Sequence, residues 1–150
     1  MEATEGGTRR HLRDLVEALD PAEFRVSLAV SLGRDPAFHD DLAAYAARGV
    51  PVNEVPMKRG IAPFSDLLSL ARLVCLVRRA RPDVIHAHSA KAGWLARLAG
   101  AGCHVPVVYT PHAFPFLMSC GTFFRRAYWL LEKGARGPTA ALIAVSEEEV

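Results

Sequence analysis

The sequence predicts an α/β fold, specifically a Rossmann-like, doubly wound domain with a mostly parallel sheet. Short apolar runs rich in β-branched residues alternate with longer segments whose apolar residues recur at helical spacing, and this alternation is typical of βαβ units. Hydrophobic residues make up 51% of the 150 residues, which excludes a disordered chain. A glycine pair, Gly6-Gly7, precedes the first helix, as in the first turn of doubly wound domains.

A glycine pair and a proline delimit the first helix. Thr8 is the expected N-cap, and apolar residues at positions 12, 15, 16 and 19 form one helical face. Asp20-Pro21 ends the helix, because the residue before a proline disfavours the helical region. The apolar run at 24–32 then predicts a strand.

Prolines and a glycine mark the next two helices. Asp35-Pro36 opens a helix that closes near Gly49, and a short strand follows at 50–55. Ser65 or Asp66 is the expected cap of a third helix, which runs through Val77. Arginines lie in or just past its last turn, where cations suit the helix dipole.

The second half of the chain continues the order of strand and helix. A strand at 84–88 leads into a small-residue helix at 90–99 that ends at Gly100, and the next strand spans 105–110. An aromatic, basic helix at 123–133 precedes a strand at 139–145, and Ser146 caps a further helix. Because a doubly wound fold starts with a strand before its first glycine turn, we expect a fragment that lacks its first strand.

Composition excludes several classes of protein. The formal net charge is +2, which argues against a nucleic-acid-coating protein. The three cysteines are scattered, which excludes a disulfide framework and a cysteine zinc site and suits a reducing cytosol. No apolar run reaches the roughly 18 residues of a membrane span, and the start is unlike a signal peptide. We therefore expect a cytoplasmic protein with no nucleic-acid partner.

Histidines follow two predicted strands at their carboxyl ends, where open α/β sheets bind ligands. His86 and His88 lie two apart on one strand and so share a face. His88 is at the strand end, whereas His86 is deeper and is expected to be a hydrogen-bonded core histidine. Lys91 follows in the next helix, and His112 follows the next strand. We expect His88 and His112 to share one crevice, with Lys91 near it.

Each of these features has an alternative interpretation. Gly6 and Gly7 form an anion site in principle, but a tight turn also explains them. The set His86, His88 and His112 suggests a metal site, yet no carboxylate follows as in the hydrolase pattern His-x-His-x-Asp-His, so we expect none. The helix at 123–133 either lies on a membrane surface or packs its aromatic residues on the sheet and exposes its arginines.

Five stretches together resemble the N-terminal domain of glycosyltransferase family 4, retaining enzymes of GT-B fold. They are GGTRRHL at 6–12, GVPVNEVPMKRGIAPFSDL at 49–67, RPDVIHAHSAKAG at 81–93, PVVYTPHAF at 106–114 and LIAVSEEE at 142–149. The second stretch resembles the bacterial surface-polysaccharide branch. The resemblance implies that residues 1–150 form the acceptor-side domain, truncated at both ends, without the C-terminal domain that holds most of the nucleotide site.

The resemblance also implies roles for individual residues. Gly6 and Gly7 match the loop that faces the diphosphate of the sugar nucleotide, and His112 matches a catalytic histidine near the transferred sugar. Ser146-Glu147 matches the family's VSE segment. The residues that match the acceptor side of the cleft are Thr8, His88, Ser89 and Lys91.

The implied function is retaining transfer of a sugar from a nucleotide-sugar donor to a glycan or lipid-linked acceptor. No metal or other cofactor is implied, and the fragment alone is expected to be inactive. The expected location is the cytoplasm, at the inner face of the membrane if the helix at 123–133 contacts lipid. Two other functions stay open: a non-catalytic nucleotide- or sugar-binding module, and a metal-dependent hydrolase.

Overall fold

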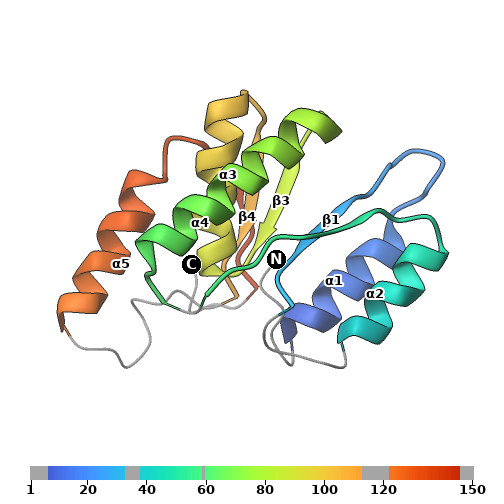
Figure 1. The fold of residues 1–150 in the computed structure, drawn as a ribbon, viewed down its shortest axis with the longest axis horizontal. Coiled ribbons are helices and arrows are strands. Elements are labelled where there is room, and N and C mark those ends of the chain that lie inside the picture. Colours follow the sequence, from blue (N-terminus) through green and yellow to red (C-terminus); the bar gives the residue numbers. More distant parts are fainter. Residues whose placement is uncertain (1–6, 33–37, 59, 113–121, 146–150) are drawn as a thin grey trace.

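The computed structural model describes residues 7–32, 38–58, 60–112 and 122–145. Helices and strands alternate along these residues, as the sequence predicts (Figure 1). In chain order they are α1 (Gly7–Ala18), β1 (Leu28–Val30), α2 (Phe38–Ala47), β2 (Val52–Glu54), α3 (Pro63–Ala80), β3 (Ile85–His88), α4 (Ala90–Cys103), β4 (Val107–Thr110), α5 (Thr122–Gly134) and β5 (Thr139–Leu142).

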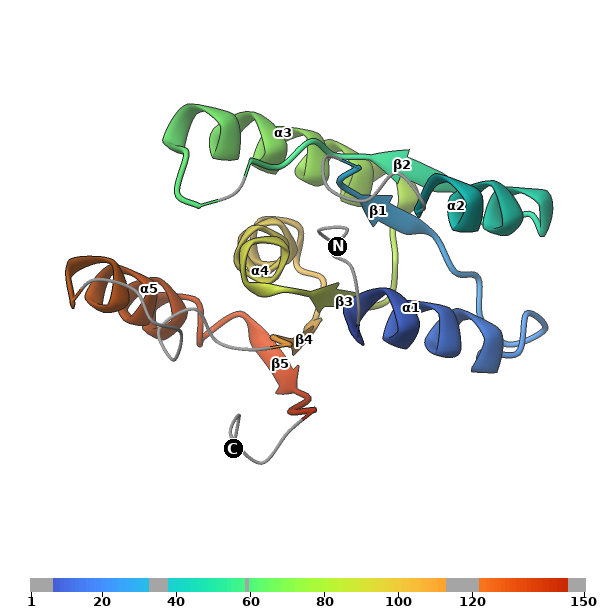
Figure 2. The same cartoon turned by 90° about the horizontal axis from the view of Figure 1, so that it is seen from below.

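All strand pairs among the described residues are parallel. β1 pairs with β2, and β3, β4 and β5 form a second sheet in that order. The chain adds β2 outside β1, crosses over through α3 to β3, and then adds β4 and β5 outward. The winding therefore reverses between β1 and β3, and Figure 2 shows β3 with α4 on one side and α1 on the other. This arrangement confirms the α/β, Rossmann-like doubly wound prediction.

Each sheet has its own hydrophobic core. The first core joins α1, β1 and α2 through buried side chains that include Leu12, Val30 and Phe38. The second joins α3, α4, β3 and β4 around Leu95 and Tyr109, which are fully buried. The two cores correspond to the two sides of the reversal in winding.

The paired strands are shorter than the apolar runs that predict them. The run at 24–32 contributes only the three residues of β1 to the ladder. Val26 and Leu32 beyond its ends still pack against the first core. Burial of side chains therefore extends further along the chain than backbone pairing does.

Two helix boundaries differ from the prediction at their starts. α1 already includes Gly7, so Thr8 lies in its first turn and is not the N-cap. α3 begins two residues before Ser65, with Ala62 as N-cap and Pro63 at N1, a position that suits the fixed φ of proline. Asp66 reaches back instead, and its Oδ2 accepts a hydrogen bond from the Ala62 N–H at 2.9 Å.

The end of α4 also differs, because Gly100 has a packing role and does not end the helix. A Cβ on Gly100 would lie 2.4 Å from Cγ2 of Val107, so glycine allows the helix to approach β4 closely. α4 continues to Cys103, and His104 caps it in the left-handed region. The predicted start of the second helix, Asp35-Pro36, lies outside the described residues, as does Ser146.

Candidate functional site

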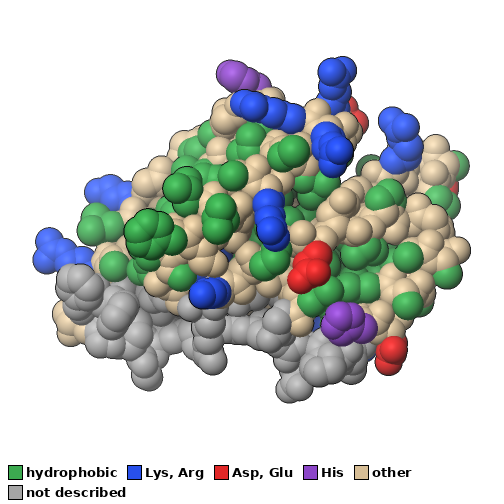
Figure 3. Space-filling view, in the orientation of Figure 1, with side chains coloured by type: hydrophobic (Ala, Val, Ile, Leu, Met, Phe, Trp, Pro, Cys, Tyr) green, Lys and Arg blue, Asp and Glu red, His purple; other side chains and the backbone are tan. Residues whose placement is uncertain are grey.

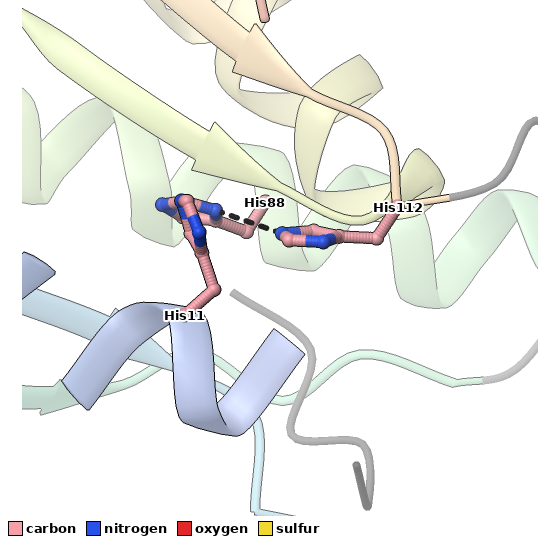
Figure 4. Close-up of side chains that lie close together, drawn as sticks. All are labelled: His11, His88 and His112. Carbon is pink, nitrogen blue, oxygen red and sulfur yellow. Dashed lines mark hydrogen bonds between the residues drawn. The ribbon is translucent and has the colours of Figure 1, made fainter. Parts of the chain in front are cut away.

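His88 and His112 lie together beyond the carboxyl ends of β3 and β4. His88 Nδ1 is 3.2 Å from His112 Nε2, within hydrogen-bonding distance (Figure 4). β3 and β4 are adjacent and parallel, with His88 paired to Thr110 in register, so residues at their ends must be neighbours. The expected juxtaposition of the two histidines is confirmed.

A third histidine, His11, reaches the pair from α1. Its ring centroid lies 5.3 Å from that of His88 and 5.2 Å from that of His112, and Figure 4 shows it facing both. The strand-end pattern that predicts His88 and His112 does not include this residue. The signal was present, because position 11 falls on the same helical stripe as Thr8, Leu12 and Leu15.

His86 completes the histidine cluster, by which we mean His11, His86, His88 and His112. Its Nε2 lies 2.9 Å from Oγ1 of Thr110, and its ring centroid is 4.2 Å from that of His88. The predicted hydrogen bond is therefore present, but His86 is only partly buried and belongs to neither hydrophobic core.

Burial favours the neutral forms of His86 and His88. It lowers the pKa of His88 to about 2, with a smaller contribution from the neighbouring histidines. The pKa of His86 is also lowered, again mainly by burial and then by His11 and His112. A neutral imidazole has one N–H donor and one acceptor nitrogen. Near pH 7 these two rings can therefore donate to or accept from a ligand without carrying a charge.

The backbone is strained at both strand ends. Ser89, directly after β3, has φ of 72°, and His112, two residues after the end of β4, has φ of 54°. Non-glycine residues in such conformations cost about 1–3 kcal/mol each and cluster at functional sites. Two of the buried polar atoms here, Ser89 Oγ and His11 Nε2, have no hydrogen-bond partner among the described residues. Buried polar groups are normally paired, so these atoms are available to a ligand.

Lys91 has a different partner from the one expected. Its Nζ lies 2.6 Å from Oδ1 of Asp66 on α3, and both side chains are largely buried. The ammonium charge is thus compensated by a carboxylate. No hydrogen bond between Lys91 and His88 is found among the described residues.

The amino end of α1 points toward the histidine cluster. His11, in the second turn of α1, contacts His88, and Thr8, one turn earlier, is buried. A helix start offers free N–H groups and a partial positive charge to an anion. Gly7 is the first residue of this helix, whereas Gly6 lies outside the described residues.

α5 exposes part of its apolar surface. Trp129 is 48% exposed and Leu130 is 53% exposed, and Arg125 and Arg126 are also exposed. The side chains of the other aromatic residues of this helix are not among those described. For Trp129, the interpretation that the helix hides its aromatic residues on the sheet is therefore wrong. Among the described residues, no helix is long and apolar enough to cross a membrane.

Three members of the cluster meet the geometric requirement for a metal site. His11, His88 and His112 each offer one ring nitrogen, and the three nitrogens lie within 4.8 Å of one another. In the set suggested by the sequence the third histidine is His86, but its Nε2 contacts Thr110. In the structure the third histidine of the set is His11.

The fold defines a class of protein, the doubly wound α/β domains, in which ligands generally bind beyond the strand ends, next to the reversal in winding. The chain belongs to the family described as glycosyl transferase 4-like domain, whose family model matches residues 6–150.

Two curated relatives are glycosyltransferases by name. The chain is 35% identical over 92 residues to the UDP-Gal:alpha-D-GlcNAc-diphosphoundecaprenol alpha-1,3-galactosyltransferase of Escherichia coli, an alignment that covers 61% of this chain and 24% of the relative. It is 28% identical over 137 residues to the capsular polysaccharide biosynthesis glycosyltransferase CapM of Staphylococcus aureus, an alignment that covers 91% of this chain and 34% of the relative. The chain thus spans about a quarter to a third of the length of these relatives.

Solved structures share the fold. MurG from Acinetobacter baumannii matches with a TM-score of 0.68 at 12% identity, covering 100% of this chain and 40% of that one. UDP-GlcNAc 2-epimerase from Methanocaldococcus jannaschii matches with a TM-score of 0.57 at 12% identity, covering 97% of this chain and 38% of that one. Since one of the two is an epimerase, the fold does not by itself specify the reaction.

Proposed function

We propose that this chain is the acceptor-side domain of a retaining glycosyltransferase, which transfers a sugar from a nucleotide-sugar donor to a glycan or lipid-linked acceptor. Family membership and the names of the two relatives support the reaction class. The observation that carries the proposal is the pair His88 and His112, joined at 3.2 Å beyond two strand ends. The donor's nucleotide would be held mainly by a second, C-terminal domain.

The proposed chemistry uses the cluster as a set of N–H donors. As the bond between the anomeric carbon and the diphosphate oxygen breaks, negative charge grows on the leaving group. The acceptor oxygen bonds to the anomeric carbon, and its proton passes to the departing phosphate oxygen. N–H groups positioned for that charge stabilise the transition state more than the ground state. His112 and the amino end of α1 are the groups placed for this role.

This proposal predicts that the 150-residue chain has no transferase activity alone. We expect no product from UDP-galactose and a lipid-diphosphate-linked N-acetylglucosamine acceptor, because the leaving nucleotide has too few partners. The full-length protein, which includes the proposed C-terminal domain, is the matched control and should be active with its own donor. Turnover by the isolated chain would contradict the proposal that a C-terminal domain holds the donor nucleotide. Binding of a sugar nucleotide without turnover in either form would favour the stand-alone binding module.

We also propose that the reaction needs no metal, although three imidazoles can bind one. A hydrogen bond between His88 Nδ1 and His112 Nε2 occupies one nitrogen of each ring, and no carboxylate belongs to the set of ligands found among the described residues. We therefore expect purified protein to contain far less than one zinc per chain by elemental analysis. A full equivalent of zinc that His11→Ala removes would instead favour the metal-dependent hydrolase.

We propose further that the protein acts at the cytoplasmic face of the membrane, with α5 as one contact. Trp129 and Leu130 offer exposed apolar surface beside Arg125 and Arg126, a combination suited to anionic lipid. A second exposed apolar group lies at the start of α3, where Phe64 is 89% exposed. In Figure 3, hydrophobic side chains and cations alternate over the face along which α3 runs.

Vesicle sedimentation tests the membrane contact. Exchanging Trp129 and Leu130 for serine together should lower binding to phosphatidylglycerol vesicles by at least about tenfold, because each large apolar side chain is worth roughly 1–3 kcal/mol when buried. Phe24→Ser, which removes a side chain exposed to the same extent on another part of the surface, should leave binding unchanged. Equal binding by the double variant and the parent chain would exclude α5 as a contact.

A further inference from the structure

Three imidazoles from three separate segments converge beyond the edge of the sheet. His11 comes from α1, His88 from the end of β3 and His112 from the residues after β4, and Figure 4 shows the rings gathered together. One nitrogen of each ring lies within 4.8 Å of the other two. Imidazole is the commonest protein ligand of transition-metal ions, so this convergence offers a chemistry that the proposed sugar transfer does not use.

The spacing of two of the rings fits a tetrahedral ion. His88 Nδ1 and His112 Nε2 lie 3.2 Å apart. Two nitrogen ligands of a tetrahedral zinc ion, each bonded at about 2.0–2.1 Å, lie about 3.3 Å from one another. A neutral imidazole can carry its proton on either nitrogen. An ion can therefore replace the hydrogen bond between these two rings with only small ring rotations.

His11 provides the third ligand. Its ring faces both of the other rings in Figure 4, and its Nε2 is buried without a hydrogen-bond partner among the described residues. Buried polar atoms are normally paired. An ion bonded to this nitrogen would supply the partner that it lacks.

The donor set selects the class of ion. Imidazoles suit zinc, cobalt(II), nickel and copper(II), whereas magnesium and manganese prefer oxygen ligands. Within the part of the chain that the structure describes, the set includes no carboxylate. Three uncharged ligands leave the ion its full double positive charge beside the amino end of α1, which carries a partial positive charge of its own. This repulsion favours an exchangeable ion over a permanently bound one.

We propose that His11, His88 and His112 form a reversible inhibitory site for zinc and similar transition-metal ions. The inhibition rests on the proposed function, in which His112 donates an N–H to the leaving group. A ring nitrogen that is bonded to a metal carries no N–H. An ion held by the Nε2 of His112 therefore removes the donor from the nitrogen that faces His88.

Titration of the metal-free chain tests the site independently of any reaction. We expect one equivalent of zinc to bind in calorimetry and one equivalent of cobalt(II) to give the visible absorption of a tetrahedral complex, whereas magnesium should give no signal. His11→Phe keeps an aromatic ring but removes the ligand nitrogen. It should lower the zinc affinity at least about tenfold, because loss of a group that only orients a ligand already costs about 10–100-fold.

The matched control is His39→Ala, which removes an exposed histidine of α2 and should leave the zinc affinity unchanged. His112→Asn, a residue type that tolerates the positive φ at this position, should lower the affinity to the same extent as His11→Phe. Circular dichroism on the same samples establishes that each variant is folded. Unchanged zinc affinity in either folded ligand variant would overturn the site, as would equal binding of magnesium.

Zinc titration of the transfer reaction tests the inhibition. In the full-length protein, half-inhibition should occur near the zinc dissociation constant that calorimetry gives for the same protein, and a chelator should restore turnover. Zinc that binds without lowering turnover, or that raises it, would overturn the inhibitory role. If the full-length protein transfers no sugar, the proposed function fails, while the binding experiment still decides whether the three histidines hold an ion.

Discussion

Replacing His112 with alanine in the full-length protein should lower kcat by about 10²–10³-fold, the cost of one lost transition-state donor. The KM for the donor should change much less, because a contact made mainly in the transition state affects turnover and not ground-state binding. His112 lies within hydrogen-bonding distance of His88 beyond the strand ends, where the proposed mechanism requires a donor. Steady-state kinetics and a thermal midpoint on the same preparation measure both effects.

Two controls separate catalysis from support of the loop. His39→Ala removes an exposed histidine on α2 and should leave kcat unchanged. His112→Asn retains a residue type that tolerates the positive φ at this position but shortens the side chain. If His112 only braces the backbone, the asparagine variant will keep normal turnover and the alanine variant will lose only stability. We expect instead that both variants lose turnover.

Glu132→Ala should destabilise the domain by about 3–5 kcal/mol, because it leaves a buried guanidinium without its carboxylate. Arg97 is 2% exposed, and its Nη2 lies 2.7 Å from Oε2 of Glu132. The same guanidinium lies over the ring of Tyr109 at 4.3 Å, and the Tyr109 hydroxyl donates to Oε1 of Glu132 at 3.3 Å. One side chain therefore joins α5 to α4 and β4.

Chemical denaturation measures this effect, with two comparisons. Asp14→Ala breaks the exposed ion pair with Arg10 on α1 and should change the free energy of unfolding little, since such pairs contribute little to stability. The double variant Arg97→Met with Glu132→Leu removes both charges and should recover much of the loss. A loss below about 1 kcal/mol in Glu132→Ala would show that water reaches the guanidinium and that the pair is not effectively buried.

The histidine pair could be predicted from the sequence because it depends only on strand position. Residues that follow neighbouring parallel strands meet at one edge of a sheet, so the positions of His88 and His112 after two apolar runs were sufficient. His11 required knowledge of how α1 is rotated and which edge it covers. Because histidine is polar, the apolar pattern of α1 does not identify His11 as part of the stripe that faces the protein interior.

Ion pairs between helices could not be predicted in the same way. Lys91 and Asp66 are 25 residues apart, and Arg97 and Glu132 are 35 apart. Nothing in their local sequence distinguishes these side chains from the exposed charges of other helices. Their pairing depends on which faces of α3, α4 and α5 meet, and the packing of the second core sets those faces.

The sequence by itself determined the α/β class, the order of helices and strands, and the location of polar residues at the carboxyl ends of β3 and β4. These features follow from hydrophobic periodicity and from glycines and prolines, all of which act over a few residues. Tertiary structure alone decided that His11 joins the cluster, that Asp66 neutralises the charge of Lys91, and that α4 continues past Gly100. Each of these features depends on contacts between segments distant in the chain.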